Sequence, residues 1–326
     1  MDLRDNLEGH SGFAMGRRVA LIIGNSNYRG SISSLLNPAN DARDVARSIE
    51  SVGFDVDLLL DATRDEMNKA VLAFKDRLHD SDVGLFYYAG HAVQVNGRNF
   101  MMPVESDLQI TDMRQDTLAD YVSLETVEID HVLGRMAAAE PDLNIVILDA
   151  CRDNPFKGST RGLSRGLAQT LAPRGTFIAY ATAPGKVAED GRGNNSPYTS
   201  ALVEAVKIPG LKIEDVFKQV RRDVALQTDG RQTPWENSSI YGDFYFTPPA
   251  PTPPLTATLP EPLPAPAPEK APVTATIPDI LPTPENRTAP SESPARVQAQ
   301  TPAPVDEDET TVRSKRPSIN RFIITP

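Results

Sequence analysis

The residue of this sequence best suited to chemistry is its only cysteine, Cys151, in the stretch VILDACRD. A lone cysteine in an apolar run is usually a small buried side chain. A histidine placed beside it would remove its proton and generate the thiolate, which is the reactive nucleophile. His91, one of four histidines, follows an apolar run in LFYYAGHA much as Cys151 follows VILDA. The two residues are therefore a candidate thiol–imidazole pair.

The other histidines have simpler explanations. His10 lies in the N-terminal segment, His79 ends a predicted helix, where a cation suits the dipole, and His131 lies within another helix. No second cysteine or nearby histidine completes a set of metal ligands around Cys151. We expect neither a metal ion nor a cofactor at the site.

The two residues can meet only if the elements that carry them are neighbours. Short apolar runs alternate with amphipathic segments, which predicts a mostly parallel sheet with helices on both faces. Functional groups of such sheets gather beyond the carboxyl ends of the strands. The predicted strands are 19–24, 54–60, 83–89, 143–150 and 175–181, with a hairpin turned on Asn96 and Gly97. The predicted helices are 38–52, 64–78, 124–139, 197–207 and 213–227, with caps at Asn37, Thr63 and Ser196.

Proline marks the domain boundary. Of the 29 prolines, nine precede Thr247 and twenty follow it. Residues 17–246 are therefore expected to form one α/β domain. Residues 247–326 are expected to be a disordered Pro-rich tail, because this composition cannot build a core. Residues 1–16 are expected to be a flexible N-terminal segment.

Charge and apolar content exclude several classes of protein. The net charge is −11, and residues 1–246 account for −9 of it, because the tail holds nine acids and seven bases. A nucleic-acid-binding protein would present a basic face instead. One cysteine forms no internal disulfide, and we find neither a membrane-spanning run nor a signal-peptide core. We expect a cytoplasmic protein with no membrane partner, and export only if the start site is misassigned.

Four stretches carry a resemblance to a known family: ALIIGNSNYRG, LFYYAGHA, LDACRDNPF and YATAPG. In this order they resemble the caspase-like cysteine peptidases of clan CD, and within that group the paracaspases and bacterial caspase homologues. The likeness covers residues 17–246. It implies a three-layer caspase-like fold and a cysteine endopeptidase acting on peptide or protein substrates.

The resemblance also implies roles for individual residues. His91 matches the general base and Cys151 the nucleophile of the family. The oxyanion hole would be formed by the backbone N–H groups of Cys151 and Ala92. Members of the family usually have His-Gly at the base, so Ala92 is a departure, although alanine retains its N–H.

Three acids match the pocket with which paracaspases hold Arg or Lys at the P1 position, namely Asp41, Asp149 and Asp190. Carboxylates suit a guanidinium through paired, charge-assisted hydrogen bonds. Each acid has an alternative reading: Asp41 as a first-turn helix residue, and Asp190 as a loop residue that Glu189 could replace. Asp149 is harder to explain otherwise, because an acid on an apolar strand needs a partner.

The segment after Cys151 is rich in glycine, serine and arginine. An Arg/Lys-specific protease could cleave itself there, after Lys157, Arg161, Arg165 or Arg174. Alternatively these bases neutralise an acidic surface. Metacaspases need calcium and paracaspases generally do not, and the sequence shows no calcium-binding cluster.

Two further functions compete with the peptidase. One is a catalytically silent caspase-like scaffold whose Pro-rich tail docks other proteins. The intact His91 and Cys151 pair favours the enzyme, whereas Ala92 and the tail leave room for the scaffold. The other is a small-molecule hydrolase or signalling domain, which loses support because no phosphate-binding glycine-rich loop is present.

Overall fold

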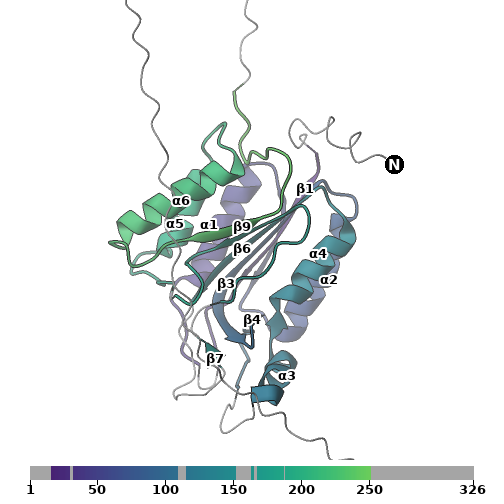
Figure 1. Ribbon diagram of the computed structural model, residues 1–326, viewed down its shortest axis with the longest axis vertical. Coiled ribbons are helices and arrows are strands. Elements are labelled where there is room, and N and C mark those ends of the chain that lie inside the picture. The colour runs from purple at the N-terminus through teal and green to yellow at the C-terminus, as the bar shows by residue number, and fades with distance from the viewer. Residues whose placement is uncertain are drawn as a thin grey trace, which may run out of the picture. The chain divides into compact units, whose positions relative to one another are not determined.

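A computed structural model describes residues 16–29, 32–108, 115–151, 163–164, 167–186 and 188–250. Within this part, a central sheet lies between two layers of helices (Figure 1). The expected flexible N-terminal segment, apart from Gly16, and the tail beyond residue 250 lie outside the described residues.

Five parallel strands form the centre of the sheet. The order is β2-β1-β3-β6-β8-β9, and only the edge strand β9 of this path is antiparallel. The strands are β1 (Arg18–Gly24), β2 (Asp55–Leu60), β3 (Val83–Val95), β6 (Leu143–Cys151), β8 (Thr176–Tyr180) and β9 (Trp235–Ser238). The predicted parallel α/β sheet is confirmed. Strand β9 lies outside the predicted strands, because its sequence WENS has little apolar character.

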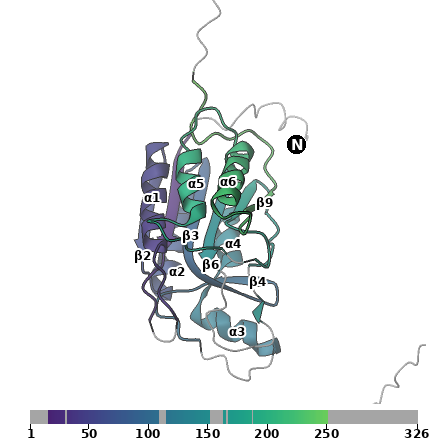
Figure 2. The ribbon, with the colours of Figure 1, turned by 90° about the vertical axis from the view of Figure 1, so that its left-hand side faces the viewer.

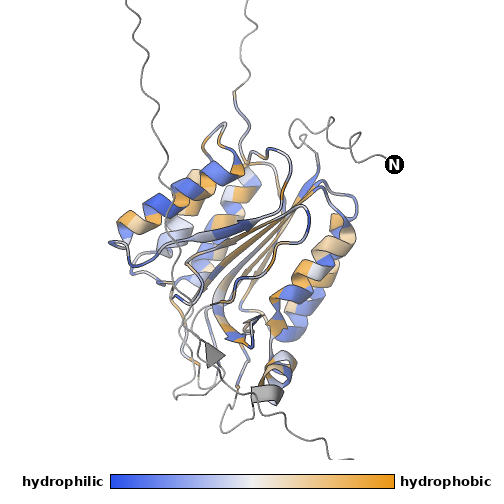
Figure 3. Ribbon diagram, in the orientation of Figure 1, coloured by the Kyte–Doolittle hydropathy of each residue, from blue (hydrophilic) through white to orange (hydrophobic). Residues whose placement is uncertain are grey.

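Helices cover both faces of the sheet, as predicted. Helices α1 (Pro38–Ser51), α5 (Pro197–Ala205) and α6 (Ile213–Gln227) pack on one face, and α2 (Arg64–Leu78) and α4 (Ile129–Ala139) pack on the other (Figures 1 and 2). Each of these helices carries both hydrophobic and hydrophilic residues (Figure 3). Burial of the apolar side of each helix against the sheet holds the layers together.

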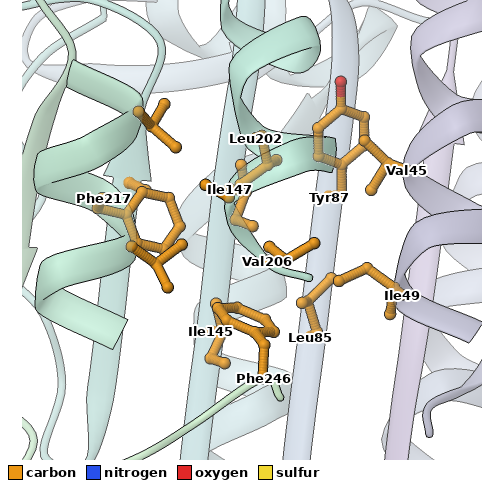
Figure 4. Packing of buried hydrophobic residues seen from close by; sticks show 14 of the residues in the cluster. Val45, Ile49, Leu85, Tyr87, Ile145, Ile147, Leu202, Val206, Phe217 and Phe246 are labelled. Carbon is orange, nitrogen blue, oxygen red and sulfur yellow. The ribbon is translucent and has the colours of Figure 1, made fainter. Parts of the chain in front are cut away.

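Alternating residues of the central strands pack into two hydrophobic cores, one on each face of the sheet. Leu85 and Tyr87 of β3 pack with α1 and α5 on one face (Figure 4). Phe86 and Tyr88 lie on the other face, against the side of α2 and α4. Both faces are apolar, which is typical of a parallel sheet covered on two sides.

The hairpin after the third predicted strand has the predicted turn but a longer first strand. Strand β3 continues through His91 to Val95, turns at Asn96 (φ 49°) and Gly97 (φ 80°), and pairs with β4 (Arg98–Met101). Left-handed backbone at both turn positions is the geometry that Asn-Gly favours. His91 therefore lies inside a strand, not after one.

The single helix predicted over residues 124–139 is wrong. Helix α3 (Gln115–Glu125) ends first, β5 (Val127–Glu128) follows, and α4 begins at Ile129. The break has a tertiary cause, because β5 pairs with β4 and Glu128 accepts two hydrogen bonds from the guanidinium of Arg98. The short strand β7 (Leu163–Ser164) pairs with the far end of β3.

Candidate active site

His91 and Cys151, the predicted general base and nucleophile, occupy paired positions on adjacent strands. In the parallel ladder of β3 and β6, His91 is the register partner of Cys151, the last residue of β6. Register partners on adjacent strands lie beside each other across the ladder. The structure describes Cys151 through its backbone, and this pairing brings the two residues together at one end of the sheet.

His91 is buried and held in one orientation. Its Nε2 atom lies 2.9 Å from the carbonyl oxygen of Ser33. A carbonyl only accepts hydrogen bonds, so Nε2 carries the hydrogen and, in the neutral ring, Nδ1 carries the lone pair. The ring of Tyr28 packs against the imidazole with 4.7 Å between centroids. These contacts fix the tautomer that lets Nδ1 accept a proton.

The hydroxyl groups of two tyrosines form hydrogen bonds with the backbone of His91. The amide of His91 donates to the hydroxyl of Tyr28 at 2.7 Å, and the hydroxyl of Tyr88 donates to the carbonyl of His91 at 2.7 Å. A Cβ atom at Gly90 would lie 2.6 Å from the Tyr28 oxygen and 2.7 Å from the Tyr88 oxygen. Only glycine fits there, and its φ of +151° also disfavours other residues. Sequence reasoning missed Tyr28, although it lies in the motif ALIIGNSNYRG.

The amide of Ala92 faces β6, the strand that ends at Cys151. The carbonyl of Ala89 accepts a hydrogen bond from the amide of Asn25, which follows β1. The carbonyl of His91 accepts one from the amide of Met102, which follows β4. Because successive strand residues direct their amides to opposite edges, the Ala92 N–H points toward β6. Ala92 is not among the described residues with positive φ, so this backbone accommodates alanine. Its oxyanion role stays a prediction.

The structure brings together two of the three predicted pocket acids at one residue. Asp41 lies in the first turn of α1, and Asp149 lies on β6, and both are buried. The amide of Ser196 donates to Asp41 Oδ1 at 3.0 Å, and the hydroxyl of Ser196 donates to Asp149 Oδ2 at 2.5 Å. The hydroxyl of Thr199 also donates to Asp149 Oδ2, at 2.9 Å. Ser196 directly precedes α5, and Thr199 lies in its first turn. From the sequence, Ser196 was predicted only as a helix cap.

Asp190 makes a different set of contacts. Its carboxylate accepts hydrogen bonds from the amides of Leu36 (2.9 Å) and Asn37 (3.3 Å), and its carbonyl accepts one from the Asn37 side chain. The predicted side-chain cap by Asn37 is wrong for this reason: Asn37 precedes α1 but makes no capping bond. Glu189, the alternative to Asp190, pairs with Arg231 at 2.9 Å.

The negative charges of Asp149 and Asp190 act on Asp41. The pKa of Asp41 is raised from 3.8 to about 8, first by burial and second by the negative charge of Asp149, with a further contribution from Asp190. Hydrogen bonds from Ser196 and Asn195 act in the opposite direction. Among the described residues, no lysine or arginine forms an ion pair with Asp41. A cation entering beside this group would relieve the repulsion between carboxylates.

Several other expectations concern residues away from these acids. The proposed self-cleavage positions Lys157, Arg161 and Arg165 lie outside the described residues. Arg174 lies with its guanidinium 5.7 Å from the ring centre of Tyr241.

In the described part of the chain, no group of three or more His, Cys, Asp or Glu side chains has the arrangement of a metal site. None of its helices is both long and apolar enough to span a bilayer.

Comparison with known proteins identifies the family of the chain. The family model of the caspase domain, Peptidase_C14, matches residues 17–245. The chain belongs to this family of cysteine peptidases, as the motifs predicted.

Two curated relatives match part of the chain. Over 135 residues it is 36% identical to human mucosa-associated lymphoid tissue lymphoma translocation protein 1 and 34% identical to the homolog from Mus musculus. Each alignment covers 41% of this chain and 15% of the relative's length.

Proposed function

We propose that the protein is a cysteine endopeptidase that cleaves peptide bonds after arginine or lysine. Nδ1 of His91 takes the proton of the Cys151 thiol, and the thiolate attacks the carbonyl carbon of the scissile bond. The protonated imidazole then gives its proton to the leaving amine, and water hydrolyses the thioester. The reaction needs no cofactor, because thiol and imidazole supply the nucleophile and the proton transfers.

The observation that carries this proposal is the pairing of His91 with Cys151 in the β3–β6 ladder. Ser33 supports it, because its carbonyl selects the imidazole tautomer whose Nδ1 accepts a proton. The Ala92 amide faces β6 and is the nearest candidate for one oxyanion donor, with the Cys151 amide as the other. The β3–β6 ladder ends at the pair of His91 and Cys151, so the Ala92 amide lies one residue beyond the last paired position.

The preference for a basic P1 residue rests on the buried acids. Asp41 and Asp149 both accept hydrogen bonds from Ser196, and Asp190 lies within electrostatic range of Asp41. Buried carboxylates are costly unless a cation or hydrogen-bond donors compensate them. A guanidinium or ammonium group from the substrate supplies that compensation, whereas an acidic P1 side chain adds to the repulsion.

A silent scaffold is the competing function. It depends on Ala92 being incompatible with catalysis, and the ordinary backbone at Ala92 weakens that argument. The docking role of the Pro-rich tail remains part of this alternative.

One assay separates the two functions. The full chain and a Cys151→Ala variant are incubated with fluorogenic peptides that end in Arg, Lys or Asp, with calcium or with a chelator. We expect the wild-type chain alone to hydrolyse the Arg and Lys peptides, equally with and without calcium. Absence of turnover with every peptide would refute the peptidase, and turnover after Asp alone would refute the acidic pocket.

Self-cleavage is tested on the same samples. We propose that it occurs after a basic residue between Lys157 and Arg174, so the wild-type chain should yield two fragments on a denaturing gel. The Cys151→Ala variant should remain intact. A wild-type chain that turns over peptides but stays a single band would show that processing is not required.

A further inference from the structure

Ser196 contacts two of the buried pocket acids through different atoms. Its backbone N–H donates a hydrogen bond to Asp41, and its side-chain O–H donates one to Asp149. Ser196 is itself buried and directly precedes α5, where Pro197 begins the helix. The two acids come from separate elements, α1 and β6, so this one residue connects them through hydrogen bonds.

The hydrogen bonds around Ser196 have a defined direction. An ionised carboxylate only accepts hydrogen bonds, so the hydroxyls of Ser196 and Thr199 both direct their hydrogens to Asp149 Oδ2. The Ser196 oxygen in turn accepts the amide of Thr199 at 2.9 Å. The Thr199 oxygen, 2.7 Å from the hydroxyl oxygen of Tyr87, accepts that hydrogen. In Figure 4 the Tyr87 oxygen points away from the apolar side chains around its ring.

This arrangement opposes the rotation of the two neighbouring buried acids away from each other. Like charges in a poorly solvated place repel, and they relieve the repulsion by rotating apart or by taking up a proton. Two hydroxyl donors stabilise the charge on Asp149 and fix the direction of its Oδ2 atom. The amide of Ser196 fixes Asp41 Oδ1, because it belongs to the start of a helix packed on the sheet.

We propose that Ser196 is a positioning residue for P1 recognition, which holds Asp41 and Asp149 in the one arrangement that receives a cationic side chain. The inference rests on the proposed function, because it concerns the pocket of that reaction.

The position of Ser196 also bears on the choice between arginine and lysine at P1. The planar guanidinium of arginine engages two aligned carboxylates at once, whereas the ammonium of lysine is a point charge that tolerates misalignment. Ser196 therefore favours arginine over lysine.

Ser196→Ala in the full chain tests this role. The substitution keeps the amide that serves Asp41 but removes the hydroxyl that serves Asp149. We expect KM for an Arg peptide to rise about tenfold or more, because a hydrogen bond to a buried charged group is lost. KM for the Lys peptide should rise less, and kcat should stay within about threefold, because the P1 contact is made before the chemical step. Ser196→Thr keeps a hydroxyl and should restore most of the preference for arginine.

The same substitution removes a helix cap, and a matched control isolates that effect. Thr63 caps α2 on the opposite face of the sheet, and its side chain accepts from the amide of Glu66. Thr63→Ala should lower the melting temperature to an extent similar to Ser196→Ala and leave KM unchanged. If Ser196→Ala does not fold, Ser196→Gly replaces it, because glycine is nearly as good a cap as serine.

The outcomes distinguish the two proposals. If the wild-type chain cleaves no peptide, the proposed function is refuted, and this inference with it. If the wild-type chain prefers arginine and both Ser196→Ala and Ser196→Gly keep its KM values and its Arg-to-Lys ratio, only the role of Ser196 is refuted. A loss of the arginine preference in these variants but not in Thr63→Ala supports the inference.

Discussion

The Nε2 atom of His91 lies 2.9 Å from the carbonyl oxygen of Ser33, a residue of the segment that leads into α1. A backbone carbonyl is thus the group that orients the imidazole of the proposed general base. It carries no net charge, so it selects a tautomer without adding a negative charge beside the imidazole. The segment that holds Ser33 is itself held at Leu36 and Asn37 by Asp190.

We predict that Asp190 affects both recognition and catalysis. Asp190→Asn removes a charge near the pocket and weakens the bonds to the segment that contains Ser33. We expect kcat and kcat/KM for an Arg peptide both to fall, by roughly 3- to 10-fold, because charge-assisted hydrogen bonds are replaced by neutral ones. Glu189→Gln is the matched control, since Glu189 pairs with Arg231 instead. Equal effects of the two substitutions would contradict this role.

Tyr28 is predicted to position His91. Tyr28→Phe keeps the ring against the imidazole but removes the hydroxyl that accepts the His91 amide. We expect kcat to fall about tenfold, because a buried donor is left unsatisfied and the base loses its fixed place. The apparent pKa of the rate profile should shift as well, which a merely structural role would not cause. Tyr241→Phe, at an exposed tyrosine, should change neither quantity.

Gly90 and Gly134 should respond oppositely to alanine. Gly90→Ala places a Cβ against the oxygens of Tyr28 and Tyr88, and we expect the unfolding free energy to fall by about 1–3 kcal/mol, as for other overpacked sites. Gly134 lies within α4, and a Cβ added there would meet no neighbouring side chain, so alanine should raise stability by up to about 1 kcal/mol. Urea unfolding measures both, and a destabilised Gly134→Ala with a neutral Gly90→Ala would reverse the expectation.

The pKa of Asp41 predicts a pH-dependent stability. Burial and the charge of Asp149 raise this pKa from 3.8 to about 8, so between these values the folded protein retains a proton that the unfolded chain releases. Stability is therefore lost as pH rises through this range, by at most about 1.4 kcal/mol per pH unit. Asp41→Asn carries no such proton. Its unfolding free energy relative to wild type should increase from about pH 5 to pH 8 and level off above.

Denaturant unfolding at several pH values checks this prediction. Thr63→Ala changes no ionisable group and should differ from wild type by a constant amount between about pH 6 and pH 8. A relative stability of Asp41→Asn that stayed constant or decreased over the same range would show that Asp41 is already ionised in the folded protein.

Local sequence was sufficient for most elements of the sheet and its helices. Thr63 caps α2 as expected, where Glu66 completes a capping box, and Asn96-Gly97 forms the expected turn, because these signals act within a few residues. The end of α3 and the strand β5 were not predictable in this way. They depend on pairing with β4 and on the ion pair of Arg98 with Glu128, both of which join residues distant in sequence.

The sequence by itself determined the family. It pointed to His91 and Cys151 because both lie at the ends of apolar runs, and to Asp41, Asp149 and Asp190 through the resemblance to that family. Only the tertiary structure decided which residues hold them. Ser33 and Tyr28 reach His91, and Ser196 reaches Asp41 and Asp149, across gaps in the sequence that no local pattern records. Hydrogen bonds depend on distance and direction in space, and the order of strands in the sheet sets both.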